Sequence, residues 1–475
     1  MDLIKYFVKC DKGWYHIPSG EVERQIKDDI HQYSIDLVNT DDNGNNILHI
    51  LCETGCVDII ALLLAKKYPW SDYIDVKNNK GKTPLHIACN SYKGVEIVKL
   101  LIDFGADVNL CDNYNNTALH YACENRNEDI LEILIDFNAQ SLNVVNNNGR
   151  TPLYHACVNE NISCVNVLVN CPNIDLNRCD DNGKTPLMVC VNLGNHDYVE
   201  LLLGLHEKII YTEHDFLVAD LVPKYYPNID DNPININQTD NDGNTALHWA
   251  CYDNCEYNTI WILFGHPKID VNRVNDDGDT PLVVACMVGN LYIIPPLLMH
   301  DNIDVNSVTN NYDTLIHLCC RINGPIRYSC GEKKILEDII FHPKLDVNAM
   351  NYDGDTALHI ACHDNNYDVT KILLSHPNLD INKPDSVKTI HDNCNHDEDC
   401  TSTTFCLYLS SVVKDRHNTT PLMVACKNGH NDIVELLLSH PKINIHSVDS
   451  NGYGAITYAQ KFCSPSVVGK LLSMH

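Results

Sequence analysis

Apolar residues along this chain recur at helical spacing in short segments, which are separated by clusters of Asn, Asp and Gly. In residues 433–438 (IVELLL), apolar side chains three and four positions apart share one helical face. Asn428-Gly429 before this segment suits a turn, and Pro441 after it cannot continue a helix. The pattern predicts short amphipathic helices joined by tight turns.

A motif that marks the start of a helix recurs with a period of 34 residues. Residues 83–89 read TPLHIAC and residues 117–123 read TALHYAC. Threonine fits the N-cap because its hydroxyl accepts a bond from a free backbone amide, and proline fits the next position because it lacks that amide. Counted from the Thr position, the copies begin at Asn46, Thr83, Thr117, Thr151, Thr185, Thr245, Thr280, Thr314, Thr356, Thr420 and Gly454.

A short turn precedes most copies of the motif, as in residues 79–81 (NKG) and 181–183 (DNG). Glycine reaches positive φ without steric cost, so these residues predict a hairpin-like turn, which we call a finger. A second apolar segment follows each first helix. One unit therefore consists of a finger and two helices.

A finger and two helices at a period near 33 residues, with the pattern Thr-Pro-Leu-His-x-Ala, resemble the ankyrin repeat. The resemblance extends over roughly residues 20–475 and implies an all-α solenoid of about eleven stacked repeats, each a β-hairpin-like finger plus an antiparallel helix pair. Residues 20–39 match only the second half of a repeat, so we expect an N-terminal half-repeat cap. The many asparagines resemble ankyrin proteins of protists or large DNA viruses.

The intervals between motifs predict the domain organisation. Insertions should loop out without breaking the stack, because each repeat packs only on its neighbours. The expected parts are a cap at 1–40, repeats 1–5 at 41–204, an insertion at 205–233, repeats 6–9 at 234–383 with a small insertion at 321–331, an insertion at 384–415, and repeats 10–11 with a C-terminal cap at 416–475.

Two repeats depart from the pattern. Pro295 and Pro296 fall inside the expected second helix of the seventh repeat, which predicts a kinked or shortened helix. Tyr312 replaces the finger glycine of the eighth repeat, and Leu315 replaces its proline. We therefore expect an irregular finger there.

The charge and cysteine content restrict partners and compartment. With 34 basic and 63 acidic residues, the formal net charge of −29 repels phosphate backbones and anionic lipids. We expect no nucleic acid and no membrane as partners, since no apolar run approaches the roughly 20 residues that span a bilayer. The 23 cysteines are odd in number and follow no export signal, which indicates reduced thiols. We expect a cytoplasmic monomer, in the host cytoplasm if the source is viral, with the nucleus as the alternative.

Cysteine and histidine recur at fixed positions of the motif, and both residue types could be catalytic or could bind a metal. Nine cysteines lie six residues after the anchor, a spacing that belongs to the repeat and indicates small buried side chains between helices. They are Cys52, Cys89, Cys123, Cys157, Cys251, Cys286, Cys320, Cys362 and Cys426. For the histidines at the fourth position, the resemblance implies a structural hydrogen-bonding group that ties the finger to the first helix. They are His49, His86, His120, His248, His317 and His359.

One segment offers an alternative function. Residues 391–406 contain His391, Cys394, His396, Cys400 and Cys406, which are residue types that bind zinc, although the short Cys-x2-4-Cys spacing of structural zinc sites is missing. A metal-binding or redox-responsive adaptor is therefore the alternative function. Phosphate-binding loops, nucleophile elbows and metalloprotease helices are absent from the sequence, so we expect no enzyme and no cofactor; an unrecognised enzyme is a third interpretation.

The resemblance implies a non-enzymatic interaction scaffold or adaptor that binds other proteins through a concave groove and the finger tips. The candidate binding residues lie around the finger glycines: Lys80, Lys82, Tyr114, Arg150, Lys184, Asp242, Asp277, Asp279, Tyr352, Asp355 and Tyr453. Their basic members come early in the chain and their acidic members late. We infer a groove of opposite charge in its two halves, which favours a partner with complementary patches.

Overall fold

The computed structural model divides the chain into two compact units, Met1–Asn241 and Asp242–His475. Each unit is described by itself. The structure describes residues 7–10, 13–16, 24, 28, 39–66, 72–137, 140–204, 234–252, 257–290, 292–310, 312–321, 330–385 and 418–474.

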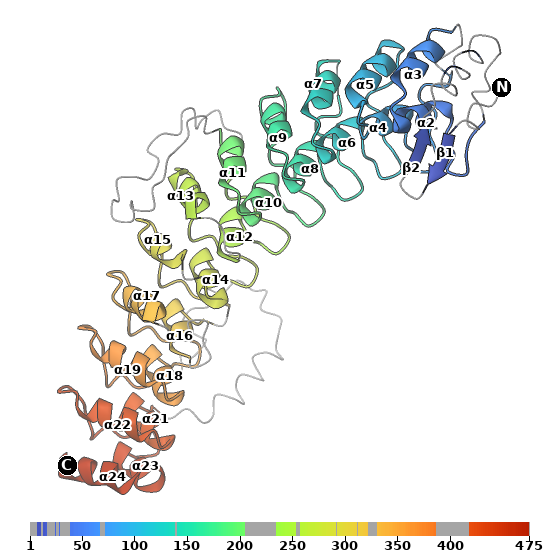
Figure 1. Ribbon diagram of the computed structural model, residues 1–475. Helices are drawn as coiled ribbons and strands as arrows, with labels where there is room; N and C mark the ends of the chain where they lie inside the picture. The colour runs from blue at the N-terminus through green and yellow to red at the C-terminus, as the bar shows by residue number, and fades with distance from the viewer. Residues whose placement is uncertain are drawn as a thin grey trace, which may run out of the picture. The chain divides into compact units, whose positions relative to one another are not determined.

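The first unit contains five helix pairs among its described residues. In Figure 1 the first helices of the pairs form one row and the second helices another, and each helix contacts its counterpart in the next pair. The pairs are α2 (Ile47–Thr54) with α3 (Val57–Leu64), α4 (Pro84–Ala88) with α5 (Gly94–Asp103), α6 (Ala118–Glu124) with α7 (Glu128–Asp136), α8 (Pro152–Val158) with α9 (Ile162–Val169), and α10 (Pro186–Asn192) with α11 (His196–Leu202).

The second unit contains six further pairs among its described residues, which confirms the expected solenoid of about eleven ankyrin-like repeats. They are α12 (Ala246–Tyr252) with α13 (Tyr257–Gly265), α14 (Pro281–Val288) with α15 (Ile294–Leu298), α16 (Leu315–Cys320) with α17 (Cys330–Ile340), α18 (Ala357–His363) with α19 (Tyr367–Leu374), α21 (Pro421–Lys427) with α22 (Asn431–Leu438), and α23 (Ala455–Phe462) with α24 (Pro465–Met474).

Helix α8 shows why the motif starts a helix. Thr151 has an extended backbone, and its hydroxyl accepts a bond of 3.2 Å from the amide of Tyr154. Pro152 occupies the first turn, where no partner for a backbone amide is needed. The apolar residues that follow, such as Leu153, are buried. Capping and burial thus act on the same few residues.

The motif cysteines form part of this core. All nine are at most 1% exposed, as their recurrence predicted. Burial raises the pKa of Cys89 to about 12 and also raises the pKa of Cys123 well above its ordinary value, so both stay as thiols near neutral pH.

Buried motif thiols are expected to resist alkylation in the native chain. Iodoacetamide labelling read by peptide mass spectrometry should modify Cys123 at least about 100-fold more slowly than the half-buried Cys179, because only a thiolate exposed by local opening reacts. In concentrated urea both should react alike. Equal native rates at the two cysteines would contradict the buried position of Cys123.

The N-terminal region differs from expectation. Strands β1 (Phe7–Cys10) and β2 (Gly13–His16) pair antiparallel, with Phe7 opposite His16, and β2 contacts α2. The sequence analysis did not predict this hairpin. Of the segment assigned to the half-repeat cap helix, the structure describes Arg24 and Asp28, both helical and exposed, and the rest lies outside the described residues.

The double proline in the seventh repeat shortens its second helix, as expected. Helix α15 begins at Ile294 and is five residues long, so Pro295 and Pro296 fall in its first turn. Backbone amides in the first turn of a helix have no acceptor within the helix, so the prolines forfeit no hydrogen bond at these positions. The predicted alternative of a kink within a longer helix does not occur.

The insertions lie at three different places in the repeat. Residues 205–233 follow α11 and lie outside the described residues, and the second insertion separates α16 from α17. The third interrupts a finger, whose two ends stay joined because the Asp385 amide donates to the Thr419 carbonyl at 2.8 Å. This stem has the same first-to-fifth bond as an uninterrupted finger, in which the Asp112 amide donates to the Asn116 carbonyl at 2.9 Å. The zinc-ligand candidates between 391 and 406 lie outside the described residues.

Candidate functional site

Seven of the described fingers are held in shape by two hydrogen bonds to the side chain of their first residue. In residues 112–116, Asp112 is buried and its Oδ1 accepts from the amides of Tyr114 at 2.9 Å and Asn116 at 2.8 Å. The same arrangement recurs at Asp41, Asn78, Asn146, Asp180, Asn275 and Asp449. The residues at the tip, such as Tyr114, then point their side chains into solvent.

Neighbouring fingers are joined to one another by a ladder of hydrogen bonds. The Asn113 amide donates to the Lys80 carbonyl at 3.0 Å, and the Asn113 side chain donates to the Asn79 carbonyl at 3.0 Å. In the second unit the Asp276 amide donates to the Asp242 carbonyl at 3.0 Å in the same way. This ladder explains many of the finger asparagines, and it joins the fingers of the first unit and the sixth to eighth fingers of the second unit into rows.

A second ladder, which sequence reasoning missed, uses the last residue of the Asp-Val-Asn segments. Asn272 Oδ1 accepts from the Asp304 amide at 2.8 Å, while its Nδ2 donates to the Asn302 carbonyl at 2.7 Å. Asn348 binds the backbone of Asp380 and Asn378 in the following repeat identically. The recurrence of this segment at a fixed place in the repeat was the available signal.

Five of the six motif histidines connect consecutive repeats through Nε2. His120 Nδ1 accepts from the Thr117 amide at 3.1 Å, and His120 Nε2 lies 3.0 Å from the Arg150 carbonyl. Because a carbonyl only accepts, Nε2 carries the proton. Burial lowers the pKa of His120 to about 4, which keeps the ring neutral. The expected tie between finger and first helix is confirmed for these five histidines, and the finger involved belongs to the next repeat. His86 Nε2 has no hydrogen-bond partner among the described residues.

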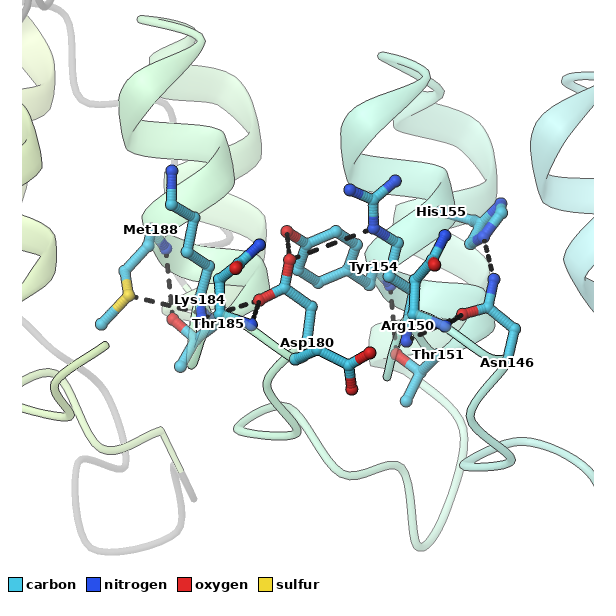
Figure 2. Close-up of polar contacts among 12 residues, drawn as sticks. Asn146, Arg150, Thr151, Tyr154, His155, Asp180, Lys184, Thr185 and Met188 are labelled. Atoms are coloured by element: carbon cyan, nitrogen blue, oxygen red, sulfur yellow. Dashed lines mark hydrogen bonds and ion pairs between the residues drawn. The ribbon is translucent and has the colours of Figure 1, made fainter. Parts of the chain in front are cut away.

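Figure 2 shows how two neighbouring fingers hold a candidate residue, Arg150. Tyr154 occupies the motif position of histidine, and its hydroxyl donates to Asp180 Oδ2 at 2.7 Å. Arg150 Nε lies 4.0 Å from the same carboxylate oxygen, and the guanidinium lies 5.2 Å from the Tyr154 ring. In a similar way Lys82 Nζ lies 4.3 Å from the Tyr121 ring. These two cations are packed against aromatic rings of the array and so help to stabilise it.

The structure places all eleven candidate residues on fingers, five in the first unit and six in the second. The exposed ones are Lys80, Tyr114, Asp242, Asp277, Tyr352 and Tyr453; the partly buried ones are Lys82, Arg150, Lys184, Asp279 and Asp355. Desolvation raises the pKa of the Asp279 carboxyl, with a further contribution from the charge of Asp277. The role of this set in binding stays a prediction.

The eighth finger keeps the regular turn, so the expectation of an irregular finger was wrong. Tyr312 takes the left-handed conformation of the missing glycine, with φ 59°. Its amide donates to the Thr309 carbonyl at 2.8 Å, and the Thr309 amide donates to the Asp313 carbonyl at 3.0 Å. The hydrogen bonds of the turn and of the neighbouring fingers impose this backbone on a tyrosine.

Apart from the fingers, the described residues contain a shallow hollow and no cluster of metal-ligating side chains. A shallow hollow of about 390 Å³ in the first unit is lined by Arg178, Cys179, Asp175 and Asp181 among others. Across the ranges that the structure describes, no three His, Cys, Asp or Glu side chains cluster as metal ligands would. The helices in those ranges also lack the length and apolar character needed to cross a bilayer.

Comparison with known proteins gives a family-level match. A family model of ankyrin repeats, three copies long, matches residues 22–112, 71–143, 138–215, 172–275, 216–309, 297–385 and 382–475, nearly the whole chain.

Individual relatives match less of the sequence. The SMC5-SMC6 complex localization factor protein 1 of Bos taurus is 41% identical over 65 residues, which is 14% of this chain and 6% of that protein. Among solved structures, the crystal structure of the ankyrin repeat domain of Bcl-3, titled a unique member of the IkappaB protein family, is 26% identical. It covers 51% of this chain and 95% of its own, with a TM-score of 0.41.

Proposed function

This chain belongs to the ankyrin repeat family, and from that premise we propose that it is a non-enzymatic scaffold or adaptor that binds partner proteins through its finger tips and first helices. Ankyrin repeat domains generally mediate protein–protein interaction. The proposal for this chain includes the concave groove expected from the sequence. It also places the protein in the cytoplasm, where the 23 cysteines, an odd number, would stay reduced.

One observation carries the proposal: the finger backbones are held by hydrogen bonds, while the side chains at their tips are exposed. The Asn147 amide donates to the Tyr114 carbonyl at 2.9 Å, yet the Tyr114 side chain is 58% exposed. A surface whose backbone is already ordered loses little conformational entropy when it binds. Exposed tyrosines on such a surface are suited to contact a protein partner.

The charges of the two units support a partner with complementary patches. Basic candidate residues, Lys80, Lys82, Arg150 and Lys184, lie on fingers of the first unit. Acidic ones, Asp242, Asp277, Asp279 and Asp355, lie on fingers of the second. Charge of opposite sign on a partner would set its orientation and speed its encounter with the array.

A finger variant is expected to lose its partner while keeping its fold. Lys80, Tyr114, Asp242 and Tyr453 are exposed, so replacing all four by Ala should leave the unfolding temperature nearly unchanged. Affinity capture from the native cell type, read by mass spectrometry, should then show a loss of at least about tenfold in one specific protein.

The matched control replaces Lys99, Glu132, Lys371 and Glu435, which are equally exposed but lie on the second helices α5, α7, α19 and α22. We expect this variant to capture the partner as the wild type does. A partner that the finger variant retains and the control variant loses would place the binding surface on the second helices, against the proposal.

A further inference from the structure

The eighth finger carries an unusual side chain at a position where its neighbours require glycine. At Gly243, a Cβ would lie 2.7 Å from the backbone nitrogen of Asp276 in the next finger, too close for an ordinary contact. Tyr312 occupies the equivalent place with φ 59°, a conformation that residues with a Cβ adopt at an energetic cost. Strained backbone of this kind is found preferentially where it serves a function.

The strained residue presents its ring to solvent beside another aromatic ring. Tyr312 is 57% exposed, and the centroid of its ring lies 5.7 Å from that of Tyr352 on the ninth finger, at an interplanar angle of 38°. Tyr352 is itself 37% exposed. The two rings stabilise each other, and substantial aromatic surface stays available to a ligand.

Carboxylates lie on the finger next to Tyr312 and on the finger of Tyr352 itself. Asp277 on the seventh finger is exposed, and its carbonyl accepts from the Asn310 amide at 3.4 Å, so its finger is adjacent to the eighth. Asp353 is exposed next to Tyr352 in the sequence. Residues 275–279, 309–313 and 351–355 contain six aspartates and neither Lys nor Arg. One of them, Asp313, forms an ion pair with Arg321 at 2.9 Å.

We propose that the Tyr312–Tyr352 pair and the carboxylates of Asp277 and Asp353 form a binding site for an arginine side chain in a basic segment of a partner protein. The inference rests on the proposed function and names the chemistry of the partner at one place on the surface. A guanidinium stacks on an aromatic face and at the same time donates paired hydrogen bonds to a carboxylate.

The overall charge also favours this occupant. A chain of formal charge −29 attracts a basic segment and repels a second copy of itself. It repels nucleic acid for the same reason. Arginine suits the site better than lysine because a compact, strongly hydrated ammonium cannot stack and pair at once.

The test uses the full chain and a fluorescein-labelled heptapeptide of alternating Gly and Arg, with a second peptide that has the neutral isostere citrulline at each Arg position. Fluorescence anisotropy should show binding of the arginine peptide at least about tenfold tighter than that of the citrulline peptide. Y312G should weaken arginine-peptide binding by about fivefold to tenfold. The double variant D277N/D353N should weaken it too and reduce its salt dependence.

Y312G introduces the residue found in eight of the other ten fingers, so we expect a thermal stability equal to or above that of the wild type. The matched control is Y92A, which removes an exposed tyrosine from the turn between α4 and α5 of the first unit, outside the fingers, where residues 89–94 hold no carboxylate. Its affinity for the arginine peptide should equal that of the wild type. Equal binding by wild type and Y312G would overturn the proposal, because net charge alone would then explain the attraction.

Other outcomes are equally decisive. A dimer of the full chain that Y312G converts to a monomer would assign the tyrosine pair to a second copy and overturn the proposal. Loss of a captured partner in the Lys80/Tyr114/Asp242/Tyr453 variant, without arginine-peptide binding by the wild type, would remove this inference and leave the proposed function intact. Peptide binding that depends on Tyr312, without any captured protein, would support the site and contradict the proposed function.

Discussion

Lowering the pH from about 7 to 5 is expected to destabilise the stacked repeats steeply. Burial lowers the pKa of His49, His120 and His359 from 6.5 to about 4. Between these values the unfolded chain binds protons that the folded chain does not. The stability from the neutral rings is therefore complete above pH 6.5 and is lost as the pH falls toward 4, by about 2 kcal/mol per histidine at pH 5.

The structural reason lies at Nδ1. In His120 this atom accepts a hydrogen bond from the Thr117 amide at 3.1 Å, and a proton placed there would meet another donor. The midpoint of urea unfolding, followed by far-UV circular dichroism from about pH 7.5 to 5, measures the effect. A midpoint that stays constant over this range would contradict it.

The chain itself supplies the control for this prediction. In the fifth repeat Met188 stands where six other repeats have histidine, and its sulfur accepts from the Thr185 amide at 3.4 Å. H120M should therefore fold, with lower stability at pH 7 because the bond to the Arg150 carbonyl is lost, but with a shallower pH dependence. A pH dependence as steep as that of the wild type would show that other groups titrate.

Replacing Gly81 by Ala is expected to destabilise the first unit by about 3 kcal/mol. The glycine has φ +74°, and an added Cβ would lie 2.6 Å from the backbone nitrogen of Asn113 on the next finger. The variant combines backbone strain with a steric clash that opens the hydrogen bond from the Asn113 amide to the Lys80 carbonyl. Urea unfolding gives the total loss, and hydrogen exchange at the Asn113 amide locates it.

Gly452 provides the matched control. Its φ is +78°, almost the same as that of Gly81, but no atom lies within 4 Å of the position that a Cβ would take. G452A should thus report backbone strain alone, about 1 kcal/mol. An equal loss of stability in G81A and G452A would show that the contact between fingers contributes nothing.

The hairpin at residues 7–16 shows a limit of the repeat-based interpretation. Asp11, Lys12 and Gly13 form a turn signal between two short segments. Because this signal falls outside the period, the search for repeats passed over it. The tertiary contact of β2 with α2 shows that the region packs beside the first repeat.

By itself, the sequence determined the repeat, the start of each helix and the apolar core. Thr151 caps α8 and Cys123 is buried, as their recurrence predicted. These features depend on residues within one turn of a helix or within one repeat period, so they can be predicted from a single sequence. The same local physics located the fingers, and with them the candidate binding residues.

Only the tertiary structure decided which side chains work together across repeats. His120 reaches the Arg150 carbonyl, and Tyr312 takes a left-handed backbone beside Tyr352, because stacking brings residues about 30 to 40 positions apart into register. Arg150 likewise packs on Tyr154 and Asp180 although its position suggested free solvent contact. Such partners are set by the distance and rotation between neighbouring repeats, which no local pattern of residues records.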